Sequence, residues 1–517
     1  MGVVYEARDD ELDRALAIKT IAEPNAAAMA HELEAERARD DAGEAIAARA
    51  ITRLIILPFR VLRSDPDTDF LAFSIPDAVG NALAGLQSLV VRPTAAGARH
   101  AGDVLDLNRI AREADVDVVL TGSLVRAGNR VQVTTQLIET PSGTLLWSHA
   151  PQVSLQDLFQ LQNEVVQGIV DSLSLSLTAR ERRLLKHDVP ASAKAYEFYL
   201  RANQASQAAT ALDPGSWAVA RDLYLQCLEE DPHYAPAWAR IGRIYRVTGK
   251  WGRAGSETNL AKAEAAFKRA LDIHPDLSIA HNLYAQLEVD LGRAEDAMLR
   301  LIERAKARGA DPELFAGLVH ACRFCGLLEA SVAAHRQARR LDPGVATSVG
   351  QTYFMLGDYA QVLAEDINAT PNVRNLALAM LGREAEAVDN FRALAKLQTT
   401  YGDLLQCGRA LLEGRHEESL AAAEAVLASK LKDPETLFYL GRILARLGER
   451  QKATSLVGRA VEYGFFCYPA IARDPWLDSL RGDAGFVAAL READTRHRGA
   501  RLTFAHAGGD RVLGLTL

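Results

Sequence analysis

The sequence has few of the residues that stabilise small secreted proteins. Only five cysteines occur among 517 residues, too few for a disulfide framework, so we expect reduced thiols and a cytoplasmic location. Aromatic residues make up only 6 %, which favours closely packed helices over a β-sandwich. No apolar run reaches the roughly 18 residues of a membrane span, and no basic segment precedes an apolar stretch as in a secretory signal.

An excess of positive charge is also missing. The chain has 59 Lys and Arg against 67 Asp and Glu, which gives a formal net charge of −8. Binding to nucleic acid or to an anionic membrane needs clustered positive charge, so we expect neither as a partner. Hydrophobic residues make up 49 %, enough to build cores and to exclude wholesale disorder.

The longest pattern in the sequence is a helical one. Residues 190–495 contain no convincing strand and repeat a helix, a glycine turn and a second helix. Most intervals between the turn glycines lie close to 34 residues, which is the period of tetratricopeptide repeats. The expected turn glycines are Gly249, Gly292, Gly326, Gly357, Gly382, Gly414 and Gly448.

Small residues keep a fixed register to these glycines. Such residues are expected where the two helices of a hairpin pass most closely, while the glycine reverses the chain with a positive φ. Proline after a second helix prevents its continuation, as we expect at Pro232, Pro275 and Pro343. The small residues are Gly242, Ala285, Val319, Gly350 and Gly441 before the turns, and Ala297, Ser331, Ala387, Ser419 and Ala453 after them.

This register resembles tetratricopeptide repeats. The resemblance implies an all-α superhelix over residues 190–495, with a concave face that binds a protein or peptide partner. Arginine on that face would suit an acidic segment or a C-terminal carboxylate. The expected groove residues are the polar ones on the first helix of each repeat: Arg240, Arg243, Asn282, Gln286, Arg323, Arg442 and Arg446. The aromatic residues Trp217, Tyr224, Trp238, Tyr245 and Phe267 have the spacing of core positions, with a peptide groove as the alternative.

Residues 51–185 alternate between strand and helix patterns. Because a hairpin signal at residues 127–129 follows this alternation, we expect a small mixed α/β domain with helices packed on its sheet. Strands are expected at 54–59, 89–92, 116–125, 131–138 and 144–147, and helices at 70–88, 104–115 and 155–177.

Five segments of this region resemble the TolB-like amino-terminal domain. That domain precedes tetratricopeptide repeats in bacterial regulators related to adenylate cyclases and serine/threonine kinases. The resemblance implies a scaffold or sensor role without catalysis. The segments are Ile55–Phe59, Asp69–Ala72, Asp117–Ser123, Gln136–Ile138 and Leu146–Ser148.

Residues 1–50 are expected to hold two short strands around a polar turn at 9–13, followed by a linker. Gly2–Ala7 and Leu16–Lys19 resemble part of the amino-terminal lobe of a bacterial serine/threonine kinase, with Lys19 where the family contacts phosphate. Phosphoryl transfer also needs a catalytic base and metal-binding carboxylates. No H-R-D-type catalytic loop or A-P-E-type segment occurs in the sequence. Lys19 is therefore expected to be a vestigial ATP contact, and the fragment raises the alternative that Met1 lies inside a longer protein.

Other candidate sites have simpler explanations. Cys322 and Cys325 have zinc-ligand spacing, but no second pair of ligands is present, so we expect a buried structural role. Residues 496–517 are expected to be a short frayed tail. The sequence thus predicts an α+β multidomain protein, a non-enzymatic scaffold or signalling regulator without a cofactor. The alternative is a serine/threonine kinase whose catalytic domain is truncated or degenerate here.

Overall fold

The computed structural model divides the chain into two units, Met1–Ile51 and Thr52–Leu517. In the first, β1 (Val3–Asp9) and β2 (Arg14–Thr20) form an antiparallel hairpin with Tyr5 opposite Ile18, so the two expected strands are confirmed. The residues described are 3–9, 14–20, 52–83, 86, 88–92, 94–100, 105–154, 157–175, 177, 181–182, 185, 190, 192–208, 217–251, 255–307, 311–342, 345–365, 369–394, 399–429 and 431–515.

The second unit begins with a mixed sheet of strand order β5-β3-β6-β7-β8. The first three strands are parallel neighbours, and β6, β7 and β8 are antiparallel. Two short strands that the sequence did not predict extend it, β4 beside β6 and β9 beside β7. The bounds are β3 (Thr52–Ile56), β4 (Arg60–Val61), β5 (Leu89–Arg92), β6 (Val118–Ala127), β7 (Arg130–Glu139), β8 (Leu145–His149) and β9 (Gln152–Ser154).

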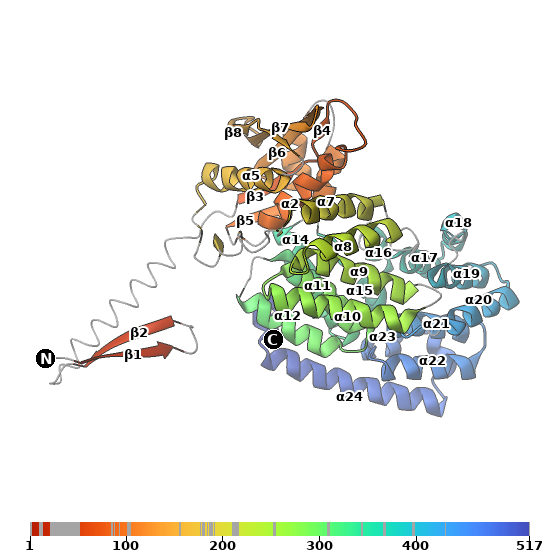
Figure 1. Cartoon of the computed structure of the whole chain (residues 1–517). Helices are drawn as coiled ribbons and strands as arrows, with labels where there is room; N and C mark the ends of the chain where they lie inside the picture. Colours follow the sequence, from red (N-terminus) through yellow and green to blue (C-terminus); the bar gives the residue numbers. More distant parts are fainter. Residues whose placement is uncertain are drawn as a thin grey trace. The chain divides into compact units, whose positions relative to one another are not determined.

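Helices cover both faces of this sheet, which explains the continuous apolar run of β3. Leu54 and Ile56 belong to the core beneath α2 (Leu71–Leu83) and α5 (Leu158–Ser172). Ile55 belongs to a second core with α4 (Leu107–Ala114) on the other face. A strand buried on both faces loses the alternation of apolar and polar residues. The expected mixed α/β region is therefore confirmed (Figure 1).

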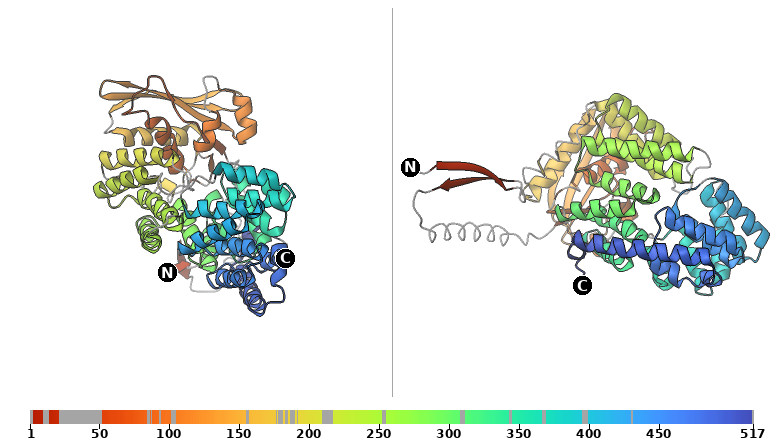
Figure 2. Two further views of the ribbon diagram at one scale, coloured as in Figure 1. Left: turned by 90° about the vertical axis from the view of Figure 1, so that its right-hand side faces the viewer. Right: turned by 90° about the horizontal axis from the view of Figure 1, so that it is seen from below.

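The remainder is an array of antiparallel helix pairs that pack on one another in chain order (Figure 2). The described residues from 192 to 515 include no strand. The pairs are α7 (Ala193–Ala208) with α8 (Ala218–Glu230), α9 (Ala235–Trp251) with α10 (Ser256–Ile273), α11 (Ser278–Asp290) with α12 (Ala294–Ala307), α13 (Pro312–Phe324) with α14 (Leu328–Leu341), α15 (Val349–Leu356) with α16 (Tyr359–Ala364), α17 (Pro371–Met380) with α18 (Glu384–Leu394), α19 (Thr400–Leu412) with α20 (His416–Ala428), and α21 (Pro434–Arg446) with α22 (Arg450–Glu462).

Six of the seven expected turn glycines reverse the chain. Gly292, Gly326, Gly357, Gly382, Gly414 and Gly448 all have φ between 72° and 86°. The prediction for Gly249 was wrong, because α9 continues through it to Trp251, and the glycine with positive φ before α10 is its N-cap Gly255, where φ is 71°. A Cβ on Gly249 would lie 2.9 Å from Cγ of Leu260, so this glycine allows close helix packing instead.

Several of the small residues lie at helix crossings, as expected. A Cβ on Gly242 would lie 2.7 Å from the ring of Phe267. At two crossings the returning helix donates a hydroxyl hydrogen bond to the first helix: Ser331 Oγ to the carbonyl of Val319 at 2.7 Å, and Ser419 Oγ to that of Cys407 at 2.8 Å. Pro232 and Pro275 follow the ends of α8 and α10, and Pro343 lies outside the described residues.

The α/β region and the first helix pairs share one hydrophobic core. Helix α7 packs against α2 and α5, and Tyr196 and Tyr199 of α7 join the cluster that contains Leu71 and Val165. Terminal repeats need such a cover because their outer face has no neighbour. The α/β region therefore caps the array.

The C-terminal segment is helical, which corrects the expectation of a frayed tail. After α23 (Tyr468–Arg473) and η4 (Pro475–Leu480), α24 (Ala484–His506) packs on α22 and returns to α12. It is followed by α25 (Gly509–Leu513), and Phe504 and Leu513 are buried. Buried apolar residues thus anchor a segment that composition alone did not assign. Among the residues described, no helix combines the length and hydropathy that crossing a bilayer requires.

Candidate binding site

Four cationic residues follow one face of α9. Arg240, Arg243, Arg246 and Lys250 are spaced by three, three and four residues, so they project from the same side of the helix. Asn282, Gln286 and Asp290 repeat every four residues on the neighbouring first helix, α11, and Glu313 stands in the first turn of α13. We call these eight residues the charged stripe.

Asp290 pairs with both cations in the C-terminal half of the α9 row. Arg246 Nε donates to Asp290 Oδ2 at 2.6 Å, and Lys250 Nζ donates to Oδ1 at 2.7 Å. Arg246 Nη1 also donates to Gln286 Oε1 at 2.9 Å. Burial alone would raise the pKa of Asp290, but the two cations hold it below its ordinary value. Asp290 is therefore a charged cross-link between α9 and α11.

Arg243 has no such carboxylate. Its guanidinium lies over the Trp217 ring, 5.0 Å from the centroid, and it forms no ion pair with a described residue. Burial and the neighbouring Arg240 lower the pKa of Arg243 to about 10. Its side chain has intermediate solvent exposure, and Glu313 acts against the lowering of its pKa without forming an ion pair with it.

Arg240 connects the stripe to the α/β region. Its Nη2 lies 3.8 Å from Oδ2 of Asp77 in α2. Asn81 Nδ2 donates to the same oxygen at 3.0 Å, and Asn203 of α7 lies within 3.5 Å. Burial raises the pKa of Asp77. Although burial lowers it, the neighbouring Tyr199, Asp77 and Tyr224 together raise the pKa of Arg240. The ion pair of Arg240 with Asp77 is nevertheless longer than that of Arg246 with Asp290, at 3.8 Å against 2.6 Å.

Glu313 extends the stripe to α13. Asn282 Nδ2 donates to Glu313 Oε2, and Gln286 Nε2 donates to Asn282 Oδ1 at 3.4 Å. Burial raises the pKa of Glu313. The structure thus brings together four of the expected groove residues: Arg240, Arg243, Asn282 and Gln286.

The other expected groove residues lie elsewhere. Arg323 is fully buried: its Nε and Nη2 each lie 3.1 Å from an oxygen of Glu435, and its Nη1 donates to the Ser348 carbonyl at 2.9 Å. Arg442 is also fully buried and is paired with Asp474. Both side chains are buried and held by carboxylates within the chain, so neither belongs to the charged stripe. Arg446 is exposed at the C-terminal end of α21, away from the stripe.

The start of α21 closes the array on itself. Asp433, the N-cap of α21, lies 3.3 Å from Lys250 Nζ of α9. The Trp251 and Tyr401 rings meet edge to face with centroids 4.9 Å apart. Helices far apart in sequence are therefore joined to one another.

Helical spacing in the sequence could have identified three stripe residues that were not predicted. Arg246 and Lys250 continue the helical spacing of Arg240 and Arg243, and Asp290 continues that of Asn282 and Gln286. Asp77 comes from the α/β region, more than 160 positions before Arg240, and no local sequence pattern predicts that contact.

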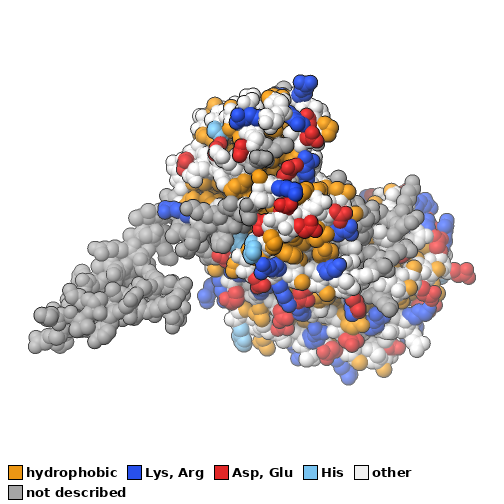
Figure 3. Space-filling model, viewed as in Figure 1, with side chains coloured by type: hydrophobic (Ala, Val, Ile, Leu, Met, Phe, Trp, Pro, Cys, Tyr) orange, Lys and Arg blue, Asp and Glu red, His pale blue; other side chains and the backbone are white. Residues whose placement is uncertain are grey.

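Figure 3 shows acidic and basic side chains interspersed over the face that it draws.

The remaining expectations concern core and cofactor residues. Trp217, Tyr224 and Phe267 are buried, and Trp238 and Tyr245 are partly buried. Cys322 and Cys325 are fully buried, and burial raises the pKa of the Cys322 thiol to about 12. Lys19 lies on β2 opposite Val4; because its side chain is outside the described structure, its ATP role stays a prediction.

Comparison with known proteins leaves the family open. No protein-family profile matches the sequence. The chain is 30 % identical over 221 residues to "Putative adenylate cyclase 3" of Rhizobium meliloti (strain 1021), a match that covers 42 % of this chain and 37 % of that relative. The match thus spans little more than a third of the relative's length.

Solved structures give weak likenesses. A human IFIT1 dimer with m7Gppp-AAAA covers 66 % of this chain and 77 % of its own, at 14 % identity and a TM-score of 0.30. The APC/C hetero-tetramer Cut9–Hcn1 covers 69 % and 80 %, at 12 % and 0.27. The P58(IPK) TPR domain covers 67 % and 98 %, at 15 % and 0.17. The geometry of the chain itself defines the class: an array of helix pairs capped by an α/β region.

Proposed function

We propose that the chain is a non-enzymatic, tetratricopeptide-type scaffold that binds an acidic segment of a partner protein on its charged stripe. The supporting observation is Arg243, a partly exposed cation that forms no ion pair with any described carboxylate, whereas Arg240, Arg246 and Lys250 on the same helix each do. Placing a carboxylate there would form a charge-assisted hydrogen bond. The same contact would raise the lowered pKa of the guanidinium.

The scaffold makes this face suitable for recognition because the stripe residues are held by helices. Asp290 fixes Arg246 and Lys250, and Trp217 supports the guanidinium plane of Arg243. A partner segment then bears most of the ordering cost, so we expect moderate affinity. Because the contacts are electrostatic and partly exposed, affinity should fall as salt rises.

The α/β region, in this proposal, is a TolB-like cap and regulatory module without catalysis. The support is its shared core with α7 and the absence of any cluster of metal-ligating side chains in the part of the chain that the structure describes. Neither kinase activity nor the activity in the relative's name is proposed. Lys19 is assigned at most a vestigial ATP contact.

The test is affinity capture with the full chain as bait. Arg243→Glu reverses the unpaired charge, and Arg501→Glu reverses an exposed arginine of α24 for which the described residues give no ion pair. We expect quantitative mass spectrometry to show partners that the Arg501→Glu bait keeps and the Arg243→Glu bait loses. Identical profiles for all three baits, each with an unchanged melting curve, would refute the proposal.

A further inference from the structure

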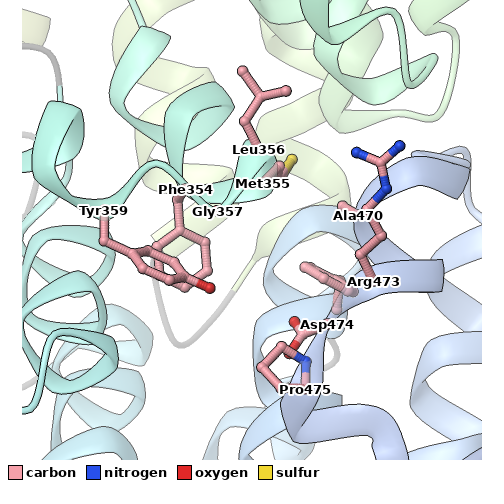
Figure 4. Close-up of a pocket in the computed structure, with 10 residues that line it drawn as sticks. Phe354, Met355, Leu356, Gly357, Tyr359, Ala470, Arg473, Asp474 and Pro475 are labelled. Atoms are coloured by element: carbon pink, nitrogen blue, oxygen red, sulfur yellow. The ribbon is translucent and has the colours of Figure 1, made fainter.

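A pocket separate from the charged stripe opens between α15–α16 and the segment after α22. One wall carries the aromatic rings of Phe354 and Tyr359, and the opposite wall carries Ala470, Asp474 and Pro475 (Figure 4). Phe438 of α21 also lines it. The pocket holds about 50 Å³. A water needs roughly 10–15 Å³ on this measure, so one short aliphatic side chain would fit.

The lining of this pocket includes an exposed cation and an exposed apolar residue. Arg473, at the end of α23, is exposed and forms no ion pair with a described residue. Leu356 lines the same pocket and is 38 % exposed. Among the described residues, the rim thus offers an apolar contact and a positive charge with nothing to neutralise it.

A second polar group lies directly behind the wall. Arg442 is fully buried, and its guanidinium lies 4.7 Å from the Phe354 ring centroid and 6.0 Å from that of Phe438. Asp474 pairs with Nε, but Nη1 has no hydrogen-bond partner in the described structure. The charge of Arg442 is therefore satisfied on one side only, next to the aromatic wall.

The hydroxyl of Tyr359 is a further polar group that lines the pocket. Figure 4 shows its oxygen directed towards the wall of Asp474 and Pro475. Burial raises the pKa of this phenol, with Arg442 and Asp474 among the charges that act on it. The phenol thus stays neutral near pH 7 and is able to donate a hydrogen bond to an anionic ligand.

We infer that this pocket is a second docking site, for a linear peptide segment in which a short aliphatic side chain stands next to a carboxylate. The aliphatic group enters between Phe354 and Ala470, and the carboxylate meets Arg473 at the rim. Charge complementarity favours a peptide with a carboxylate over a purely apolar peptide, because Arg473 has no counter-charge in the described structure.

The probe is a fluorescein-labelled peptide, Gly-Ser-Leu-Asp-Gly-Ser-amide, titrated with the full chain and followed by fluorescence anisotropy. Alanine in place of leucine should weaken binding at least tenfold, since three buried carbons are lost. Asparagine in place of aspartate should weaken it about threefold, as for an exposed ion pair.

Substitutions in the chain show whether the peptide binds in this pocket. Arg473→Ala should weaken the aspartate peptide about threefold and leave the asparagine peptide unchanged, because the two changes remove the same contact. Ala470→Leu should fill the pocket and abolish binding, with a circular-dichroism melt to verify the fold. Arg501→Ala, an exposed arginine of α24, should bind like the wild type.

Three outcomes would overturn the inference. Binding that is unaffected by Ala470→Leu in a folded protein places the peptide elsewhere. Equal binding of the aspartate and asparagine peptides removes the role of Arg473. A chain that binds no peptide, but forms a dimer that Arg473→Ala dissociates, would assign the pocket to a second copy. These results are independent of the charged stripe, whose test uses Arg243.

Discussion

At the scale of single residues, close helix contact explains the strictest sequence requirements. Gly242 is small because the Phe267 ring occupies the space where its side chain would stand. His281 is a buried imidazole that bridges a carbonyl and an arginine. In both cases the neighbours are identified, so the cost of changing the residue can be stated.

Gly242→Leu should destabilise the protein by roughly 2–3 kcal/mol through overpacking. Its Cβ alone would lie 2.7 Å from the Phe267 ring. Gly458→Ala is the matched control, because it is also inside a helix and a Cβ there would meet nothing within 4 Å. That control should stabilise α22 by about 0.5–1 kcal/mol. A Gly242→Leu protein with the wild-type denaturation midpoint would show that the crossing is misplaced.

His281 should make stability depend on pH. Its Nε2 donates to the Pro275 carbonyl at 2.8 Å, and Nδ1 accepts from Arg300 Nη1 at 2.8 Å, which suits the neutral ring. Burial lowers its pKa to about 4 from 6.5. The unfolded chain therefore binds the proton more readily, and stability is full above pH 6.5 and falls between pH 6.5 and 4.

The expected contribution is about 3 kcal/mol, from roughly 1.4 kcal/mol per unit of pKa. Denaturant unfolding at pH 7 and pH 4 should show a smaller loss for His281→Gln than for the wild type. The exposed His416 gives the control, since His416→Gln should keep the wild-type difference. If all three proteins lose the same stability, His281 is protonated equally in both states.

At the scale of elements, the turn glycines share a similar φ angle but differ in the space around them. Gly292 and Gly414 have φ of 81° and 72°. A Cβ on Gly292 would lie 2.3 Å from the carbonyl oxygen of Tyr463, whereas one on Gly414 would meet nothing within 4 Å. The α11–α12 turn is thus pressed against the chain after α22.

Gly414→Ala should cost about 1–2 kcal/mol, the penalty of a left-handed conformation with a side chain. Gly292→Ala should cost more, by roughly 1–3 kcal/mol, because the turn must also move away from Tyr463. Equilibrium unfolding of the two variants measures the difference. Equal costs would mean that the segment after α22 does not pack on this turn.

Much of the element order follows from local sequence signals. The predicted strand at 89–92 coincides with β5, and six turn glycines were placed correctly because positive φ leaves few alternatives. Gly249 failed because glycine also serves close helix packing, which spacing alone does not separate from a turn. Strands β4 and β9 have only two and three residues, too few for any periodic pattern.

The candidate site was less accessible to sequence reasoning. The stripe on α9 and α11 follows helical spacing and was partly found. Arg323 and Arg442 also lie on first helices of repeats, but they are buried and paired with Glu435 and Asp474, which are 112 and 32 positions away. Such pairings depend on how the array closes, which no local pattern encodes.

At the scale of the whole second unit, the array is covered at one end and tied across its first-helix face. The α/β region shares a core with α7 and α8, α24 returns to α12, and Lys250 meets Asp433. In this closed array the charged stripe carries Arg243, a cation that forms no ion pair with a described residue. Binding of an acidic segment there is the central claim.

Photo-crosslinking tests that claim most directly. Benzoylphenylalanine in place of Gln286 puts the reactive group on the stripe while Arg243 is kept, and the same group in place of Glu303 puts it on the exposed side of α12. We predict that irradiation in the native cell extract crosslinks a partner from position 286 through a peptide rich in Asp and Glu, and that position 303 gives none. Equal crosslinking from both positions, or partner peptides without acidic residues, would contradict the account.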